Sequence, residues 1–286
     1  MSEAGSNVTT DREALQLRVR ETLARLSRTA ERPALPTTAT AALGIARDPE
    51  ADVERLCRVV QADVGLSARL LRVANSAAYA RRTPARTLPT AVVTVGLRKT
   101  CDLLVAACAR QLYGASGGHA ERLWGQALAG AIACEELARV TRRAPVDDAF
   151  LTGLFRDVGR ITFLLSDRPA FEVIEGLVAA GEGERATLET EWYGFDHALA
   201  GAVLAEGWGL AAAQCDAIRW HHEPARATVG HALARVVNGA DALVHTIGFG
   251  ADAVPPADPL GLSPEDQASY GERVRAAYDR FRELLG

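Results

Sequence analysis

Apolar residues recur along most of this chain at the three- and four-residue spacing of amphipathic helices. In the first such segment, 11–30, Leu15, Val19, Leu23 and Leu26 share one face. Strand-like alternation is absent throughout, so the expected fold class is all-α. The same periodicity predicts further helices over 37–47, 52–63, 66–80, 90–95, 97–114, 119–142, a stretch containing 153–161, 169–181, 184–194, 196–206, 210–222, 229–247 and 263–285.

Breaks in the pattern suggest how these helices are grouped. The run "GASGG" at 114–118 is the best candidate for a boundary between two closely packed helical lobes. The polar N-terminus is expected to be disordered. The predicted organisation is a disordered stretch 1–10, an N-terminal helix 11–32, a first lobe 33–116, a second lobe 117–250, and a loop with a C-terminal helix 251–286 that packs on the domain.

Composition narrows the class of partner. The 286-residue chain carries a formal net charge of −4, which argues against broad nucleic-acid binding because that needs a basic surface. Five cysteines are scattered without a CxxC pair, as in the reduced proteins of the cytoplasm. No apolar run reaches the ~18 residues that suggest a membrane span. We expect a cytoplasmic protein that binds neither membrane nor nucleic acid.

Several polar residues fall on apolar helix faces, three or four positions from aliphatic neighbours. Buried charges are costly unless they are paired or bound to a metal. Acids and imidazoles from different helices could converge on a metal ion, or each could satisfy a local hydrogen bond. The second interpretation is preferred for any lone histidine. These residues, all expected to point inward, are Gln126, Asp157, His197, His222 and Asp241.

The adjacent histidines at 221–222 fall in the segment predicted as helix 210–222. Successive helical residues point about 100° apart. At most one of the two rings is therefore expected to reach a given centre.

Six motifs, in this order, resemble the HDOD domain family, HD-related output domains of bacterial signalling proteins. The resemblance spans about 33–250, and the family implies the same all-α fold of two packed lobes. The motifs are "LLRVANSAAY" (70–79), "TLPTAVVTVGLRKTCDLLVA" (87–106), "LWGQALAGAIACEELA" (123–138), "DDAFLTGLFRDVGRITFL" (147–164), "EWYGFDHALAGAVLAEGWGLAAAQCDAIRWHHEP" (191–224) and "ARVVNGADALVH" (234–245).

The resemblance also implies a set of site residues. Catalytic HD proteins use a histidine on the tryptophan-bearing helix, a His-Asp pair, further histidines and a final aspartate, and their metal activates water for phosphate-ester hydrolysis. Here Gln126 stands at the first position and Arg156 replaces the histidine of the pair. The residues that remain are Asp157, His197, His221, His222 and Asp241.

The two replacements weigh against catalysis. Glutamine is a poor transition-metal ligand, and arginine has no lone pair to offer. Its positive charge would also repel a dication ~4 Å away by several kcal/mol. We therefore expect a degenerate HD site with no metal, no cofactor and no catalytic residue. Arg156 could compensate Asp157, Asp241 or both, or could extend to solvent; its neighbour Asp157 need not be in contact, because adjacent helical residues diverge.

Three functions remain open. The preferred one is a regulatory pseudo-enzyme that binds an unidentified signalling protein. The runner-up is a metal-dependent phosphohydrolase with an atypical ligand set. The third is a nucleotide receptor that binds its ligand in the degenerate site, where Arg156 would suit a phosphate, or in the groove between the two lobes.

Other conspicuous residues are expected to be structural. Asn75 is expected to bond to the backbone at a helix end. The four tryptophans are expected to pack in the core rather than form a binding site; they are Trp124, Trp192, Trp208 and Trp220.

Overall fold

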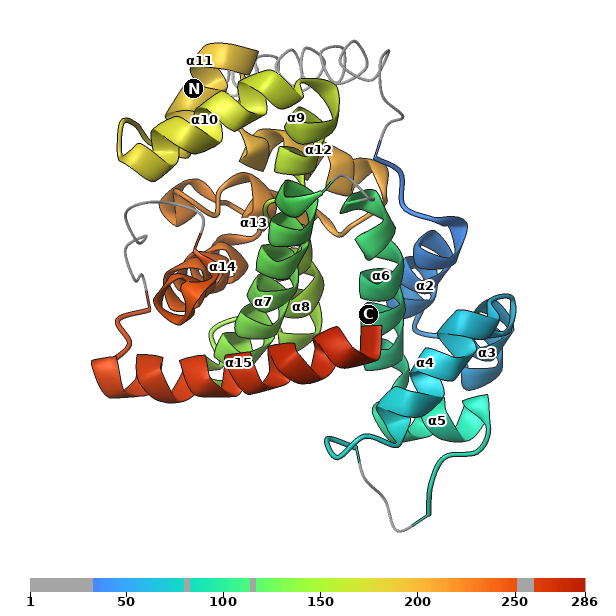
Figure 1. Cartoon of the computed structure of the whole chain (residues 1–286). Helices are drawn as coiled ribbons and strands as arrows, with labels where there is room; N and C mark the ends of the chain where they lie inside the picture. Colours follow the sequence, from blue (N-terminus) through green and yellow to red (C-terminus); the bar gives the residue numbers. More distant parts are fainter. Residues whose placement is uncertain (1–32, 80–82, 114–116, 251–259, 286) are drawn as a thin grey trace, which may run out of the picture.

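Helices account for every regular element of the computed structural model, which describes residues 33–79, 83–113, 117–250 and 260–285 (Figure 1). Within those ranges there is no strand, so the expected all-α class is confirmed. The predictions for 1–10 and 11–32 lie outside the described residues, as do 114–116 and 251–259. The lobe boundary at 114–118 therefore stays a prediction, although one helix ends at Tyr113 and the next begins at Gly118.

The first group of helices packs around the apolar helix α6, which also contacts α7 and α8 of the second group. Caps fix where two of them begin: Asp52 accepts a hydrogen bond from the Arg55 amide, and Asp63 accepts one from Leu66. The helices are α2 (Thr37–Arg47), α3 (Val53–Gln61), α4 (Val64–Ala74), α5 (Leu88–Val95) and α6 (Leu97–Tyr113).

Helix α5 forms from a β-branched run because its ends are well specified. Thr87 caps it by accepting from the Thr90 amide, so the helix begins at Leu88, two residues before the predicted start at 90. Pro89 lies in the first turn, where its missing N–H does no harm. Gly96 ends the helix at φ 94°, a conformation that favours glycine.

Asn75 ties the end of α4 to the segment before α5. Its side chain donates to the carbonyls of Leu71 and Ala85, both at 2.9 Å, and accepts from the Ala85 amide at 2.7 Å. The predicted bond from this side chain to the backbone is confirmed.

The second group is built on α7, which packs closely against α8. A Cβ at Gly153 would lie 2.6 Å from the Gly130 carbonyl oxygen, so the approach needs glycine. The helices are α7 (Gly118–Thr141), α8 (Val146–Phe155), α9 (Gly159–Ser166), α10 (Arg168–Ala180), α11 (Arg185–Tyr193), α12 (His197–Gly207), α13 (Ala212–Arg219) and α14 (His231–Val244), with the short turns η1 (Pro224–Arg226) and η2 (His245–Phe249).

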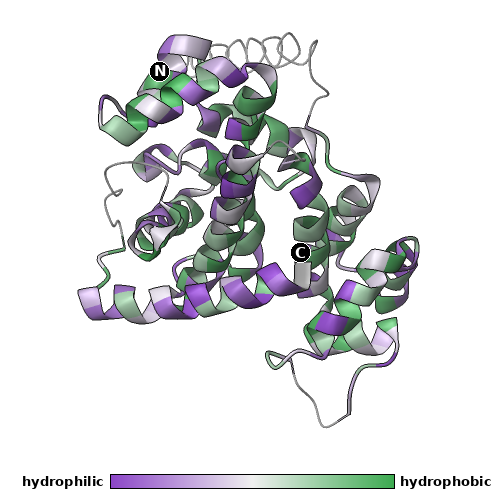
Figure 2. Ribbon diagram, viewed as in Figure 1, coloured by the Kyte–Doolittle hydropathy of each residue, from purple (hydrophilic) through white to green (hydrophobic). Residues whose placement is uncertain are grey.

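The last helix, α15 (Pro264–Leu285), crosses α7 on the outside of the molecule (Figure 1). Figure 2 shows hydrophobic residues concentrated on α7 and α8, whereas α15 is largely hydrophilic. Its contact side includes Val274, which is fully buried, and Phe281. The Lys99 ammonium lies 4.0 Å from the Phe150 ring centre and 5.7 Å from that of Phe281, which joins α6, α8 and α15.

Predicted helix 66–80 ends at Ala74 in the structure, and two further predicted helices also break or end early. The stretch around 153–161 breaks at 156–158 into α8 and α9, and Gly159 begins α9 against the backbone of α12, where a Cβ would overlap the His197 carbonyl oxygen. Helix α13 ends at Arg219, so His221 and His222 follow it rather than continue it. Both breaks lie at the candidate site.

Candidate functional site

All seven residues that the sequence assigns to the degenerate site meet between α7, α12 and α14. Each comes from a helix or from a helix end. Gln126 lies on α7, Arg156 and Asp157 in the turn between α8 and α9, His197 at the start of α12, His221 and His222 after α13, and Asp241 on α14.

Arg156 is buried at the centre of this group, with 2% of its surface exposed. Its Nε donates to Asp241, and its Nη2 lies 3.2 Å from an Asp157 carboxylate oxygen. Its Nη1 donates to the carbonyls of Gly153 at 2.9 Å and Gln126 at 3.2 Å. The guanidinium thus contacts both acids. The alternative in which Arg156 extends to solvent is wrong.

Contact between Arg156 and Asp157 departs from the expectation that these neighbours diverge. That expectation assumed a continuous helix. The break at 156–158 lets the Arg156 guanidinium contact Asp157 as well as Asp241 of α14. Space for the guanidinium comes from Gly130 on α7, because a Cβ there would overlap Nη1 and Cζ of Arg156.

The two carboxylates share this one guanidinium. Burial alone would raise the pKa of Asp157, but the Arg156 charge and the neighbouring imidazoles of His197 and His221 hold it well below its usual value. The pKa of Asp241 is instead raised, because burial and the negative charge of Asp157 outweigh the effect of Arg156. Arg156 therefore stabilises the ionised form of Asp157 more than that of Asp241.

His197 is buried and is held by Glu189 of α11. The Glu189 carboxylate lies 2.6 Å from Nδ1 of His197 and also accepts its backbone N–H at 2.8 Å. Desolvation lowers the pKa of His197, but Glu189 and Asp157 outweigh it and raise the pKa to about 10. His197 is thus a second cation of the site, with its Nε2 3.4 Å from Asp157.

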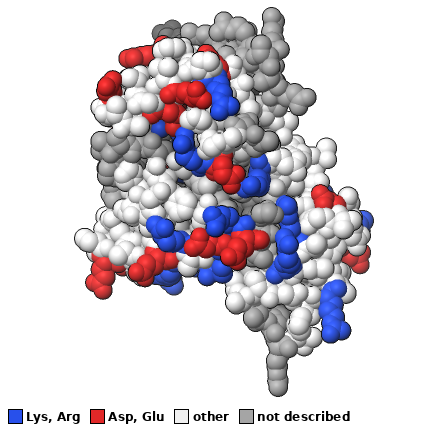
Figure 3. Space-filling model, in the orientation of Figure 1, with Lys and Arg blue, Asp and Glu red and all other residues white. Residues whose placement is uncertain are grey.

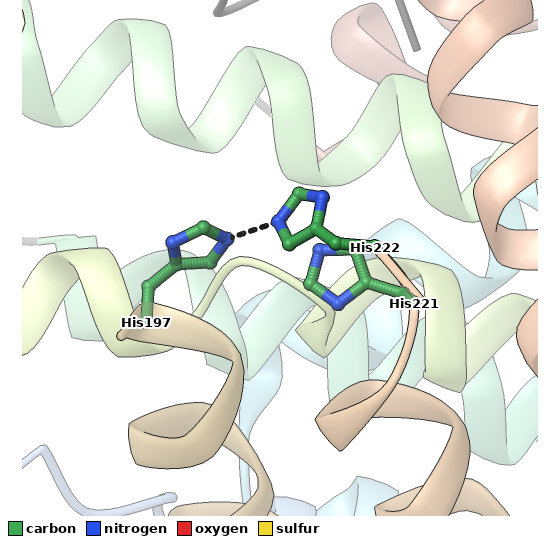
Figure 4. A group of neighbouring side chains, drawn as sticks. All are labelled: His197, His221 and His222. Atoms are coloured by element: carbon green, nitrogen blue, oxygen red, sulfur yellow. Dashed lines mark hydrogen bonds between the residues drawn. The ribbon is translucent and has the colours of Figure 1, made fainter. Parts of the chain in front are cut away.

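His221 and His222 both approach His197 (Figure 4). His221, rather than the expected His222, is the fully buried ring; its Nδ1 lies 2.7 Å from the Ile218 carbonyl, to which it donates. Its Nε2 then faces the Asp157 and Asp241 carboxylates at 3.7 and 4.0 Å without a hydrogen bond. His222 is exposed, and its Nε2 lies 2.9 Å from Nε2 of His197.

The proximity of the two rings corrects the expectation for the pair at 221–222. Their centroids are 3.9 Å apart. The expected 100° divergence does not apply, because both residues lie beyond the end of α13.

Gln126 is engaged by a second buried arginine. Its side-chain oxygen accepts from Nη1 of Arg160 at 3.1 Å, and Arg160 also pairs with Glu175 of α10 at 3.0 Å. Arg185 of α11 forms a further ion pair with Glu175. The site is therefore connected to α10 and α11 through acids and arginines.

Sequence reasoning missed Glu189 and Arg160. Both could have been found from the spacing of charged residues in the sequence. Arg160 lies four residues after Arg156 in an apolar stretch, and Glu189 lies four residues after the buried Arg185. A charged residue repeated at helical spacing on a buried face indicates an internal ion pair.

A divalent metal does not fit this arrangement of the family's metal-binding positions. Nitrogens of His197, His221 and His222 lie within 4.8 Å of one another. Each of the two acids, however, already contacts the Arg156 guanidinium. A metal among them would meet the permanent positive charge of Arg156.

Comparison with known proteins finds a matching domain family and solved structures with a similar fold. The HDOD domain model matches residues 33–224. An HDOD domain protein of unknown function from Geobacter sulfurreducens is 21% identical with a TM-score of 0.77, covering 95% of this chain and 98% of that one. A candidate signal transduction protein from Marinobacter aquaeolei VT8 is 24% identical with a TM-score of 0.76, covering 98% of this chain and 66% of that one. These likenesses show the fold.

A curated relative has a much longer chain. An uncharacterized protein of Treponema pallidum is 26% identical over 191 residues, which are 66% of this chain and 37% of the relative. Among the helices that the structure describes, none combines the length and apolarity needed to cross a membrane. Because the family model covers more than half of the sequence, this chain belongs to the HDOD domain family.

Proposed function

We propose that this protein is a non-catalytic regulatory module of bacterial signalling that acts by binding a protein partner. The observation that carries the proposal is the buried contact of Arg156 with both Asp157 and Asp241. In a metal-dependent phosphohydrolase of the HD superfamily, those acids would bind the metal. Here a cation of the polypeptide itself pairs with them.

An internal cation makes the site a structural element. Arg156 cannot lose its proton under ordinary conditions, so its charge is permanent, unlike that of an exchangeable ion. Its carbonyl contacts with Gly153 and Gln126 further fix the junction of α7 and α8. The proposal also places the protein in the cytoplasm, where its five free cysteines would stay reduced.

One observation favours the runner-up, a metal-dependent phosphohydrolase. The three imidazoles of His197, His221 and His222 lie together, and Nε2 of His221 is buried without a hydrogen-bond partner. A crystal structure from Shewanella amazonensis SB2B, of a candidate phosphohydrolase, is 24% identical with a TM-score of 0.62 and shares the fold. The charge of Arg156 among the acids is the reason to prefer a regulatory module.

In one form of the nucleotide-receptor hypothesis, Arg156 is a phosphate ligand in the degenerate site. The Nε and both Nη atoms of Arg156 already contact protein oxygens. A phosphate would therefore have to displace carboxylates that carry the same sign of charge. This geometry does not support a phosphate site at Arg156, and nucleotide binding between the lobes stays a separate prediction.

The test is metal content and phosphodiester hydrolysis of the purified chain, prepared without chelators. Bis(p-nitrophenyl) phosphate with added manganese, iron(II) or zinc is the probe, and Asp157→Asn is the matched variant. We expect that the purified chain contains no stoichiometric metal and that it does not hydrolyse the probe. Stoichiometric metal, together with hydrolysis that is lost in Asp157→Asn and lost again when EDTA is added to the parent, would overturn the proposal.

A further inference from the structure

The helical hairpin α10–α11, residues 167–193, has two chemically different sides. Its inner side reaches the site through Glu175 and Glu189. Its solvent-exposed residues, called its outer side here, include two large apolar side chains, Val173 of α10 at 49% and Trp192 of α11 at 57%. Trp192 thus departs from the expectation that all four tryptophans pack in the core.

The inner contacts are ionic and specific. Glu175 of α10 pairs with Arg160 at 3.0 Å and with Arg185, while Glu189 of α11 holds His197. Next to Trp192, the Tyr193 ring stacks on Phe163 of α9 with centroids 4.2 Å apart and planes 3° apart. A movement of α11 would therefore shift the group that holds His197.

The outer side is acidic. Arg168 is the one exposed base within 167–193, all of which the structure describes, and it pairs with Glu172 at 2.9 Å. Red side chains accordingly predominate over the α10 part of the molecule in Figure 3. The exposed acids of the hairpin are Glu172, Glu182, Glu184 and Glu191.

An exposed tryptophan within an acidic surface favours one kind of occupant. Tryptophan is enriched among residues that dominate binding energy at interfaces. Complementary charge steers association and selects partners. An amphipathic helix with one apolar and one basic side would bury Trp192 and Val173 and pair its cations with Glu172 and Glu191.

We propose that the outer side of α10–α11 docks a basic amphipathic segment of a signalling protein, with Trp192 as the anchor. The proposal rests on the proposed regulatory function and names the chemistry of its partner. Docking is transmitted inward, because Trp192 lies three residues from Glu189 on the same helix. The degenerate site thereby responds to the partner without any reaction.

Binding is tested with two labelled synthetic helical peptides of equal length and leucine spacing, one with lysine and the other with glutamate at its polar positions. Fluorescence anisotropy on the full chain should show that the lysine peptide binds and the glutamate peptide does not. Trp192→Ala should weaken binding about tenfold or more. Binding of neither peptide, or equal binding of both, would overturn the proposal.

Charge reversal and a matched apolar control sharpen the test. Glu172→Lys/Glu191→Lys should abolish binding of the lysine peptide and confer binding of the glutamate peptide. Val64 of α4, 83% exposed, is the control site, and Val64→Ala should change nothing. An equal loss of affinity in Val64→Ala and Trp192→Ala would show non-specific adhesion and overturn the assignment of this surface.

Transmission to the site has its own readout. The imidazole NMR signals of His197 should shift when the lysine peptide saturates the chain and should stay unchanged when it is added to Trp192→Ala. Unshifted signals at saturation would overturn the inward coupling. Metal-dependent hydrolysis would overturn the proposed function whether or not peptides bind, so the two failures are distinguishable.

Discussion

The guanidinium of Arg156 occupies the space that a side chain at residue 130 would fill. The three atoms nearest to a Cβ built on Gly130 are Nη1, Cζ and Nη2 of Arg156. The glycine on α7 and the arginine after α8 therefore form one packing unit. Neither residue can be exchanged for a larger or smaller one without affecting the other.

A double-mutant cycle at these positions should show a reversal of sign. Gly130→Ala should destabilise the protein by about 1–3 kcal/mol, because the added methyl group displaces a buried guanidinium. In an Arg156→Ala background the same change should be neutral or stabilising by up to ~1 kcal/mol, since alanine favours a helix interior over glycine. Urea unfolding of the four proteins measures the coupling. Equal destabilisation by Gly130→Ala in both backgrounds would contradict this packing.

Arg156→Ala alone should lower the free energy of unfolding by about 3–5 kcal/mol, because it leaves two buried carboxylates without their cation. Arg156→Lys should recover only part of the lost free energy of unfolding. A single ammonium group cannot contact both carboxylates as the separate nitrogens of the guanidinium do. Arg58, 67% exposed in its side chain, is the matched control. Its alanine variant should stay within ~0.5 kcal/mol of the parent. An Arg156→Ala effect as small as that of the control would show that the buried ion pairs contribute little.

Much of this architecture was predictable because it depends on local pattern. Helix 37–47 was predicted at its observed bounds, and Asn75 was assigned its bond to the backbone. The start of the last helix at Ser263 is also observed, because the Ser263 hydroxyl oxygen accepts the backbone N–H of Asp266 at 3.0 Å. Each of these features depends on residues close in sequence.

Tertiary contacts decided the rest. The break at 156–158 comes directly before Gly159, which approaches the α12 backbone too closely for a Cβ, and a periodic pattern does not encode that contact. Beyond the end of α13, Asn238 of α14 donates to the His221 carbonyl at 2.7 Å, a contact between residues far apart in the sequence. These two breaks determine which neighbours meet, so the set of site residues was predictable and their mutual contacts were not.

The pair His197 and Glu189 should make stability depend on alkaline pH. The raised pKa of His197, about 10, against ~6.5 in the unfolded chain, gives stabilisation that is fully present below pH ~6.5. That stabilisation is lost progressively as the pH rises through the folded value, and it amounts to a few kcal/mol in order of magnitude. Glu189→Gln removes the largest cause of the elevation.

Urea unfolding between pH 6 and 10 compares Glu189→Gln with the parent. The variant should be less stable near pH 6, and its stability should fall less steeply toward pH ~10. Glu182→Gln, at an exposed position of the same hairpin, is the control and should follow the parent curve. Parallel curves for Glu189→Gln and the parent would show that His197 is not the group being titrated.

Asp216 controls where α14, and with it Asp241, begins. One of its carboxylate oxygens accepts the backbone N–H groups of Thr228, Val229 and Gly230 at 2.7, 2.9 and 2.9 Å. Asparagine retains the shape but not the charge, and hydrogen bonds to a charged group contribute about 1.5–3 kcal/mol. Asp216→Asn should therefore destabilise the protein by about that amount and accelerate hydrogen exchange at 228–230.

The matched comparison for Asp216 is Asp167, which caps α10 through a single bond to the Ala170 amide at 3.2 Å. Asp167→Asn should have a smaller effect, because asparagine caps helices about as well as aspartate does. Hydrogen exchange at 228–230 should not respond to it, since Asp167 bonds to a different helix. If Asp216→Asn leaves exchange at 228–230 unchanged, the carboxylate does not hold this turn, and α14 must be positioned by its apolar packing alone.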